Sequence, residues 1–350
     1  MRIPSMRIRS KTTAFWIATL SCVLVAAMGL LVGCGGKRSP DRERSPGMEK
    51  VTLRLSWLID ASAAGYVVAI EKGFYEKVGL NVDVQPGGID LPPVKLIASG
   101  SGEFGQESGG ETLVIARSKH IPVKAIAGWQ PGGAPAIITL AGRGIRTPQD
   151  LAGKRVAVGY GKPVEYVYQA LLEREGVDRK TIQESVFKFD ITPLLDGRID
   201  AFTGFKVNQP FVIESKGFKP FVIDPHEYGI RTFGITLFTT DKLIEKNPDL
   251  VQRFVLASRS GWQYAFDHPE EAIDLCLAAQ GGALQYDREI EVKKLKAFGH
   301  TAPTPGKPLG WMDQAIWAEM TSRLQKCGVL ESPVDPLTIF TNRFVESGGM

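Results

Sequence analysis

Histidine and cysteine are scarce in this sequence, with four of each among 350 residues. No CxxC, HExxH or clustered His/Cys set occurs, and these are the spacings that hold zinc or redox-active thiols. We therefore expect no metal site. A GxSxG motif is also absent, and GYGK (159–162) is neither a P-loop nor a dinucleotide fingerprint. We expect no cofactor and no catalytic residue, with a dispersed Ser–His–Asp set as the remaining nucleophilic alternative.

The folded part of the chain also lacks an excess of charge. The formal net charge of +4 comes from Arg2, Arg7, Arg9 and Lys11, since residues 1–33 contain no acidic residue. The rest of the chain is formally neutral, so no basic patch calls for nucleic acid as a partner.

A single apolar run stands near the start. The run AFWIATLSCVLVAAMGLLVG follows a basic head, and LVGC (31–34) has the form of a bacterial lipobox. Basic head, apolar core and small residues before a cut are typical of an export signal. We therefore expect residues 1–33 to be a lipoprotein signal peptide and Cys34 to be lipidated. The alternative is an uncleaved anchor, because the run is also about 20 residues long, enough to span a bilayer. Both alternatives predict an extracytoplasmic, membrane-anchored protein.

Residues 34–50 are charged and rich in Gly, Pro and Ser. Such a segment cannot bury a core, so we expect a disordered tether. Of the remaining cysteines, Cys276 and Cys327 could pair outside the cytoplasm. Each lies in an apolar helical pattern, which favours buried free thiols.

From Val51 the pattern alternates between short apolar strands and helices, and it does so twice. Alternation of this kind predicts an α/β fold with largely parallel sheets. About 300 residues exceed one typical core. We therefore expect two lobes, the first from residues 51–141 and 235–350 with a helical C-terminal section, the second from 142–234. A helix is predicted over 62–79 and a strand over 184–189. The strand 234–241 is predicted to return to the first lobe.

Several segments in a fixed order resemble the solute-binding proteins of ABC importers. They are RLSWLIDASAAGYVVAIEKGFYEKVGLNVDV, LIASGSGEFG, IPVKAIAGW, IRTPQDLAGKRVAVGY, LLDGRIDAF and NPDLVQRFVLASRSGWQYAFDHPEEA. The branch resembled is that of the thiamine-pyrimidine precursor binders, which are related to pyrimidine synthases and to sulfonate and nitrate binders. The resemblance spans 51–342. It implies a two-lobed periplasmic-binding-protein fold of the second type, a small-molecule solute, an ABC permease as partner and a monomer.

The synthase branch supplies an enzyme alternative. In that branch a lysine holds pyridoxal phosphate and a nearby histidine is consumed. An ungapped reading places Ser108 and Thr112 at these positions, and YGIRTFGITLF (228–238) has none of the branch's cysteines. A Schiff base requires an amine, so the resemblance implies a binder here and not an enzyme.

The run SGSGEFGQESGGETLVIA (99–116) has the character of a loop that feeds a helix. Ser108 and Glu111 have the spacing of a capping box, which predicts a structural role for Glu111. Glu107 has no such role and is expected to face the ligand together with Ser108. Carboxylates at a helix start compete with anions for the same N–H groups, which disfavours sulfonate or nitrate.

Aromatic and polar residues near predicted strand ends complete the expected site. The resemblance implies a ligand-stacking ring at Trp57. The other candidates are Asp60, Tyr66, Trp129, Tyr160, Glu165, Asn208 and Tyr228. Flat rings with a few polar groups suit a heterocycle. The alternative for each ring is ordinary core or rim packing, and for each polar residue a solvated loop or cap.

At two places this sequence differs from the pyrimidine binders, so the identity of the ligand is not determined by the resemblance. The pyrimidine binders carry Asn and His after the first tryptophan, where this chain has LIDASAAG, and a WNxE-like run where it has FKVNQP. The candidates are a thiamine pyrimidine precursor, another pyrimidine, a flavin-like ring or an unrelated amine. A sensory binder that feeds a kinase would have the same sequence features as an importer component.

Overall fold

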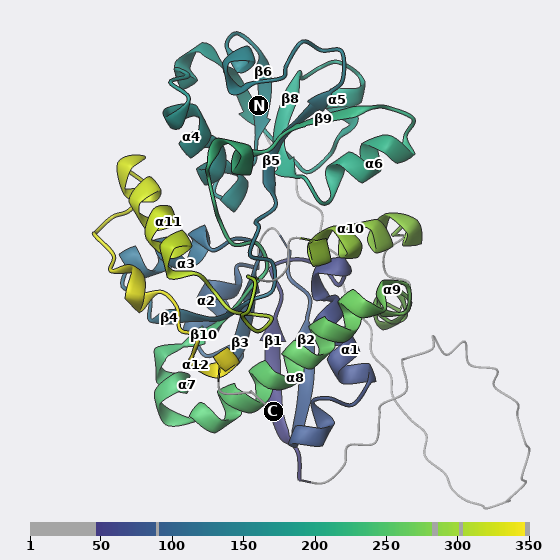
Figure 1. Cartoon of the computed structure of the whole chain (residues 1–350), viewed down its shortest axis with the longest axis vertical. Coiled ribbons are helices and arrows are strands. Elements are labelled where there is room, and N and C mark those ends of the chain that lie inside the picture. Colours follow the sequence, from purple (N-terminus) through teal and green to yellow (C-terminus); the bar gives the residue numbers. More distant parts are fainter. Residues whose placement is uncertain (1–46, 89–90, 282–285, 301–303, 347–350) are drawn as a thin grey trace, which may run out of the picture. The chain divides into compact units, whose positions relative to one another are not determined.

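The computed structural model describes residues 47–88, 91–281, 286–300 and 304–346 (Figure 1). The expected signal peptide, the expected lipid site Cys34 and most of the expected tether lie outside these residues. The first strand begins at Glu49, so the last two residues assigned to the tether belong to the fold. None of the helices within the described ranges has the length and apolarity of a membrane span.

Ten strands in the described residues form two mixed five-stranded sheets. The first sheet has the order β2-β1-β3-β10-β4 and the second the order β7-β6-β8-β5-β9. In each sheet four strands run in the same direction, and one antiparallel strand, β10 in the first sheet and β5 in the second, is inserted between two of them. The strands of the first sheet are β1 (Glu49–Arg54), β2 (Leu80–Gln85), β3 (Phe104–Glu107), β4 (Val123–Gly128) and β10 (Thr236–Thr240). Those of the second are β5 (Pro135–Leu140), β6 (Arg155–Val158), β7 (Gln183–Val186), β8 (Ala201–Phe205) and β9 (Pro220–Ile223).

Helices cover both faces of each sheet, so inner strands such as β3, β5 and β8 are buried on both sides. The α-helices are α1 (Ala64–Glu71), α2 (Pro93–Ala98), α3 (Glu111–Ser118), α4 (Pro163–Arg174), α5 (Thr192–Leu195), α6 (Gln209–Ser215), α7 (Asp241–Lys246), α8 (Pro248–Asp267), α9 (Pro269–Ala279), α10 (Arg288–His300), α11 (Gln314–Lys326) and α12 (Arg343–Glu346). The 3₁₀ helices are η1 (Ala61–Ala63), η2 (Glu76–Val78), η3 (Pro148–Leu151), η4 (Arg179–Thr181), η5 (Pro225–Tyr228) and η6 (Pro336–Thr338).

The predicted helix over 62–79 is interrupted. Helix α1 ends at Glu71 because Gly73, at φ 70°, starts a left-handed cap. The N–H of Gly73 bonds to the carbonyl of Ile70, and the N–H of Phe74 bonds to that of Ala69. This pair of bonds is the Schellman arrangement that ends helices at glycine.

Four buried clusters form the core, two against each sheet. On the first sheet, α1, α8 and α9 pack on one face and α3 and α11 on the other. Helices α1 and α8 lie side by side (Figure 1). Their backbones approach so closely that a Cβ on Gly261 would stand 2.0 Å from the carbonyl oxygen of Gly65. Cys276 and Cys327 are both free; Cys276 is buried as predicted, whereas Cys327 is half-buried.

The chain passes between the sheets twice. Strand β10 pairs with β3 and β4, as predicted from its return to the first lobe. Strand β5, which the alternation assigned to the first lobe, instead pairs with β8 and β9 in the second sheet. Sequence alternation cannot reveal this, because a strand's partner is set by pairing and not by its own pattern. The crossings are therefore 129–134 and 224–235. They are bonded to each other: Trp129 N–H to the carbonyl of Ile235, and Gly234 N–H to that of Gln130, both at 2.8 Å.

Candidate functional site

Residues that follow four strands, two from each sheet, meet in a single region. Trp57 follows β1 and Glu107 ends β3, whereas Phe189 follows β7 and Lys162 lies shortly after β6. The rings of Trp57 and Phe189 have centroids 5.9 Å apart. The charge of Lys162 acts on the carboxyl of Glu107. The carboxyl ends of strands are where ligands bind in open α/β sheets, so this region is the candidate site.

Trp57 is held in place from two sides. Its carbonyl accepts a bond of 2.8 Å from the N–H of Gly87, and its indole acts to lower the pKa of the nearby Tyr286 hydroxyl, which burial raises. Gly87 is required here, because a Cβ on it would stand 2.0 Å from the carbonyl oxygen of Leu55. The Trp57 side chain itself is half-buried. It therefore presents a fixed aromatic surface beside the end of β1.

Glu107 is the last residue of β3 and is only 6% exposed. Burial raises the pKa of Glu107 to about 8, although Lys162 and the backbone N–H of Val94 act to lower it. At neutral pH its carboxyl is therefore mostly protonated. A protonated carboxyl offers one O–H donor and an acceptor oxygen in the same plane.

The predicted capping box of Ser108 and Glu111 is wrong. The N-cap of α3 is Gly110, and Glu111 is the first helical residue. Glu111 is buried and accepts a hydrogen bond from the hydroxyl of Thr232, which lies on the second crossing. Gly110 is closely packed at this position, because a Cβ on it would stand 2.6 Å from the methyl carbon of Met320. Ser108 is half-buried in the bend before α3, beside Glu107.

Asp60 belongs to a buried ion cluster. Its carboxylate accepts from the N–H and hydroxyl of Ser62 and from Lys294, at 2.8, 2.6 and 3.0 Å. Lys294 also donates to Glu291 at 2.7 Å, and Glu291 accepts from the N–H of Ala61. Burial alone would lower the pKa of Lys294, yet the two carboxylates hold it above its ordinary value. These contacts give Asp60 a structural role, and it fixes the segment just after Trp57.

Tyr160 and Glu165 belong to a second charged cluster. The hydroxyl of Tyr160 donates to Glu184 at 2.8 Å, and Arg179 forms a two-point ion pair with Glu184 at 2.7 and 2.9 Å. Arg179 also lies 3.4 Å from Glu165. Glu165 accepts from the N–H of Gly161 at 2.7 Å, so the cluster fixes the turn after β6. The ring of Tyr160 remains 41% exposed.

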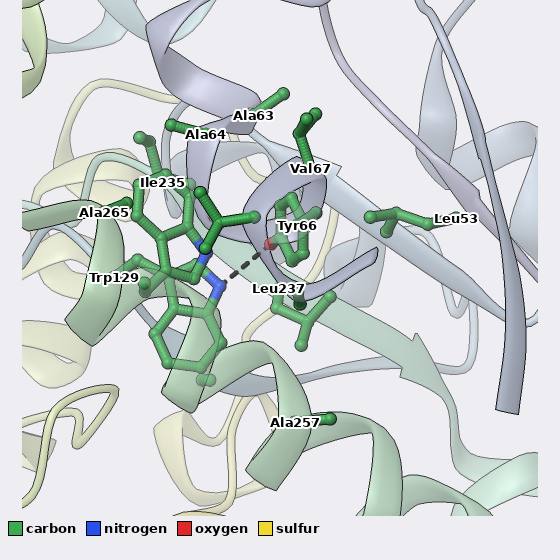
Figure 2. Packing of buried hydrophobic residues seen from close by; sticks show 14 of the residues in the cluster. Leu53, Ala63, Ala64, Tyr66, Val67, Trp129, Ile235, Leu237, Ala257 and Ala265 are labelled. Carbon is green, nitrogen blue, oxygen red and sulfur yellow. Dashed lines mark hydrogen bonds between the residues drawn. The ribbon is translucent and has the colours of Figure 1, made fainter. Parts of the chain in front are cut away.

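Two of the predicted aromatic residues lie in the core instead. Tyr66 and Trp129 are both fully buried. Figure 2 shows the indole of Trp129 directed at the hydroxyl of Tyr66, with which it forms a hydrogen bond, among apolar side chains such as Ile235 and Leu237. Both also pack on Trp262. Core packing, the alternative to ligand contact, describes both rings, and the candidate site excludes them.

The last two predicted residues come from the second crossing and from the segment after β8. Tyr228 ends η5 and packs against the second sheet's core, near Glu175. Asn208 occupies the N-cap position of α6 without a side-chain capping bond and is half-buried. Neither has a recorded contact with Trp57 or Glu107 among the described residues.

Phe189 is the site residue that sequence reasoning missed. The segment 184–189 was predicted as a strand, but β7 ends at Val186. Phe189 adopts φ 59°, which is uncommon for a bulky residue. The signal available in the sequence was the pair Phe187 and Phe189 directly after a strand. Across the described ranges, no group of three or more His, Cys, Asp or Glu residues is arranged to hold a metal.

The comparisons with known proteins agree with this architecture. The family model described as NMT1/THI5 like matches residues 60–272, which is more than half of the chain. The chain belongs to the NMT1/THI5-like family.

Among curated proteins, the chain is 27% identical over 317 residues to the formylaminopyrimidine-binding protein of Halalkalibacterium halodurans, covering 89% of this chain and 94% of that one. It is 26% identical over 360 residues to the riboflavin-binding protein RibY of Chloroflexus aurantiacus, covering 98% and 99%. It is also 23% identical over 302 residues to an enzyme, the 4-amino-5-hydroxymethyl-2-methylpyrimidine phosphate synthase of Legionella pneumophila, covering 85% and 92%.

Among solved structures, the periplasmic aliphatic sulphonate binding protein SsuA of Escherichia coli matches with a TM-score of 0.65 and 16% identity, over 84% of this chain and 92% of that one. At this identity the match shows the fold alone. The two mixed sheets with flanking helices are those of the periplasmic-binding-protein fold.

Proposed function

We propose that this chain is an extracytoplasmic solute-binding lipoprotein of an ABC importer and that it binds a small planar heterocycle between two lobes. The observation that carries the proposal is the presence of Trp57 and Glu107 at neighbouring strand ends of the first sheet. The family membership and the binding proteins among the relatives support it.

The two residues have complementary roles in this proposal. The indole of Trp57 supplies a face on which a flat ring stacks. The carboxyl of Glu107, protonated near neutral pH, pairs with an amino group and an adjacent ring nitrogen, which donate and accept in the same plane. A formylaminopyrimidine or related pyrimidine has such an edge, and a flavin ring has comparable groups. A sulfonate or nitrate has none and would place its charge beside a buried carboxyl.

We propose the two sheets as the cores of the two lobes, with the crossings 129–134 and 224–235 as the hinge. Closure about two connecting segments is the usual motion of such proteins. We further propose removal of residues 1–33, lipidation of Cys34, docking of the monomer on a membrane permease, and a binding role without catalysis.

The absence of catalysis is supported by Ser108 and Thr112, which stand where the synthases carry their lysine and histidine. It is tested by incubation of the protein with pyridoxal phosphate and borohydride. We expect only scattered labelling of exposed lysines, and a saturable, stoichiometric adduct at a single lysine would contradict the binder assignment.

The ligand is tested by titration calorimetry and thermal unfolding of the full chain in detergent. The probes are formylaminopyrimidine, riboflavin, an alkanesulfonate and nitrate. A ligand at 100 times its Kd adds about 2.7 kcal/mol to the free energy of unfolding. We expect this with a heterocycle and not with the anions. Trp57→Ala should abolish the effect, whereas Trp311→Ala, a control at a half-buried tryptophan outside the site, should not. Stabilisation by an anion alone would overturn the proposal.

A further inference from the structure

Phe189 stands opposite Trp57 and comes from the other sheet. The two rings have centroids 5.9 Å apart and planes inclined at 42°. Trp57 follows β1 of the first sheet and Phe189 follows β7 of the second. This aromatic contact therefore joins the two halves of the chain beside the candidate site.

The distance between the two rings is close to the distance expected for two rings with a planar ligand stacked between them. Carbon atoms in contact are about 3.5 Å apart, so two rings that hold a planar ligand between them stand roughly 7 Å apart. The observed separation is 5.9 Å. A small outward movement and a rotation toward parallel would admit one flat ring, and a hinge between the sheets supplies such a movement.

The surroundings of Phe189 support its ring from behind. Phe189 packs on Phe187 at 5.2 Å, and Phe187 stacks on Phe202 at 4.5 Å and 13°. Gly159, directly after β6, lies beside the ring: a Cβ there would stand 3.9 Å from the Phe189 Cζ atom, an ordinary van der Waals contact. The ring is therefore backed by an aromatic column on one side, while it remains only half-buried.

The backbone of Phe189 is held in an unfavourable conformation. A φ of 59° places this bulky residue in the left-handed region, where strained residues tend to cluster at ligand-binding and switch sites. Asp190 follows at once, and its carboxylate caps the N–H of Thr192 at 2.9 Å. This turn directs the Phe189 ring away from the course of β7 and toward Trp57.

The polar part of the site lies on the same segment as this support. Lys162, whose charge acts on Glu107, lies three residues after Gly159. The turn after β6 therefore lies near both the Phe189 ring and the Glu107 carboxyl.

We propose that Phe189 is the second stacking face of the ligand site and that a planar ring binds by entering between Trp57 and Phe189. The proposal rests on the heterocycle-binding function above and adds a specificity-determining residue from the second sheet. Two faces favour flat, extended rings over small anions, because only a flat ring contacts both at once.

The test measures Kd for formylaminopyrimidine and riboflavin by calorimetry on the full chain in detergent. Loss of one aromatic stacking face costs affinity on the order of 10- to 100-fold, from the range observed for stacked bases. We expect this loss in Phe189→Leu, which keeps an apolar side chain without a ring. Phe189→Tyr should bind as the parent does, and so should Phe218→Ala, a control at an aromatic residue exposed elsewhere on the second half of the chain.

A double-mutant cycle supplies the second readout. If both rings hold the same ligand, Trp57→Leu and Phe189→Leu will have non-additive effects on Kd. Equal Kd values for the parent and Phe189→Leu, or strictly additive effects, would overturn the clamp and leave the proposed function intact. Failure of the unmodified chain to bind either heterocycle would overturn the proposed function and the clamp together. Should Phe189→Leu fail to fold, Phe189→Tyr and the conservative Phe189→Met decide the outcome by the same criterion.

Discussion

The indole nitrogen of Trp129 donates a 2.8 Å hydrogen bond to the hydroxyl of Tyr66, and both side chains are fully buried in the core. The bond joins α1 to the start of the first crossing. It therefore connects the packing of the first sheet to the segment that leads to the second.

Removal of this hydroxyl should lower stability without affecting the ligand. In Tyr66→Phe the Trp129 N–H is buried without its acceptor, which costs about 1–3 kcal/mol. Urea unfolding measures this loss, and calorimetry should give an unchanged Kd for any heterocycle bound by the parent. Tyr228→Phe serves as a control with a half-buried ring. If Tyr66→Phe instead bound the ligand much more weakly than the parent while its free energy of unfolding was unchanged, Tyr66 would be a ligand contact.

The buried carboxyl of Glu107 should make stability depend on pH. Because its folded-state pKa is raised to about 8, the native state binds a proton that the unfolded chain has lost. Stability should therefore fall as pH rises between about 4.3 and 8, by up to ~1.4 kcal/mol per pH unit. Glu107→Gln, a neutral isostere, should lack this slope.

The comparison is made by urea unfolding at several pH values between the two pKa values and above the higher one. The variant should match the parent at acidic pH and exceed it above pH 8. Glu214→Gln, at an exposed position on α6, should leave the parent's slope intact. Identical slopes in Glu107→Gln and the parent would mean that Glu107 ionises normally.

The Asp60–Lys294–Glu291 cluster should be sensitive to loss of its cation. Lys294→Met leaves two buried carboxylates unpaired, and breaking a buried pair in this way costs about 3–5 kcal/mol. Since protonation relieves that repulsion, the loss should be smaller at acidic pH. Lys296→Met on the same helix removes an exposed ion pair with Glu270 and should change little. Thermal unfolding at two pH values decides between these outcomes, and equal losses in the two variants would contradict a structural role for the cluster.

The contact between α1 and α8 should not tolerate a methyl group. A Cβ on Gly261 would stand 2.0 Å from the carbonyl oxygen of Gly65 and 2.7 Å from the Cβ of Ala69. Overpacking typically costs 1–3 kcal/mol, and a clash with backbone places Gly261→Ala at about 3 kcal/mol or more. Ser260→Ala, one residue earlier and exposed, should be nearly neutral. A Gly261→Ala variant with the parent's midpoint would show that the two helices can separate without cost.

The sequence predicted where strands and helices lie along the chain better than it predicted which strands pair with each other. Alternating apolar segments located β10 as a strand, because a strand's own pattern shows that it is a strand, and the pairing with β3 and β4 confirmed its expected return to the first sheet. The pattern placed β5 on the wrong side of the crossing, since pairing depends on residues far away in the chain. The helix over 62–79 was predicted too long, because the pattern continues past Gly73 although the backbone turns there.

The same distinction applies to the site residues: local sequence predicts some of their roles, whereas other roles depend on packing. Glu107 was predicted correctly as a residue without a capping role, since that conclusion required only its distance from the helix start. Whether an aromatic residue after a strand points into the core depends on packing that only the fold supplies. Trp57 and Trp129 look alike in sequence, yet Trp57 meets Phe189 and Trp129 meets Tyr66. Their roles as ligand contacts or core packing could not be separated beforehand.

The place of β10 between β3 and β4 has a consequence for synthesis. All five strands of the second sheet precede residue 236, whereas the first sheet lacks an inner strand until residues 236–240 emerge. A growing chain can thus complete its second sheet while β3 and β4 still have open edges. Open strand edges template aggregation, and pairings distant in sequence form slowly. The first sheet is therefore begun first but completed last. A nascent chain that stalls before Thr236 would expose the unpaired edges of β3 and β4.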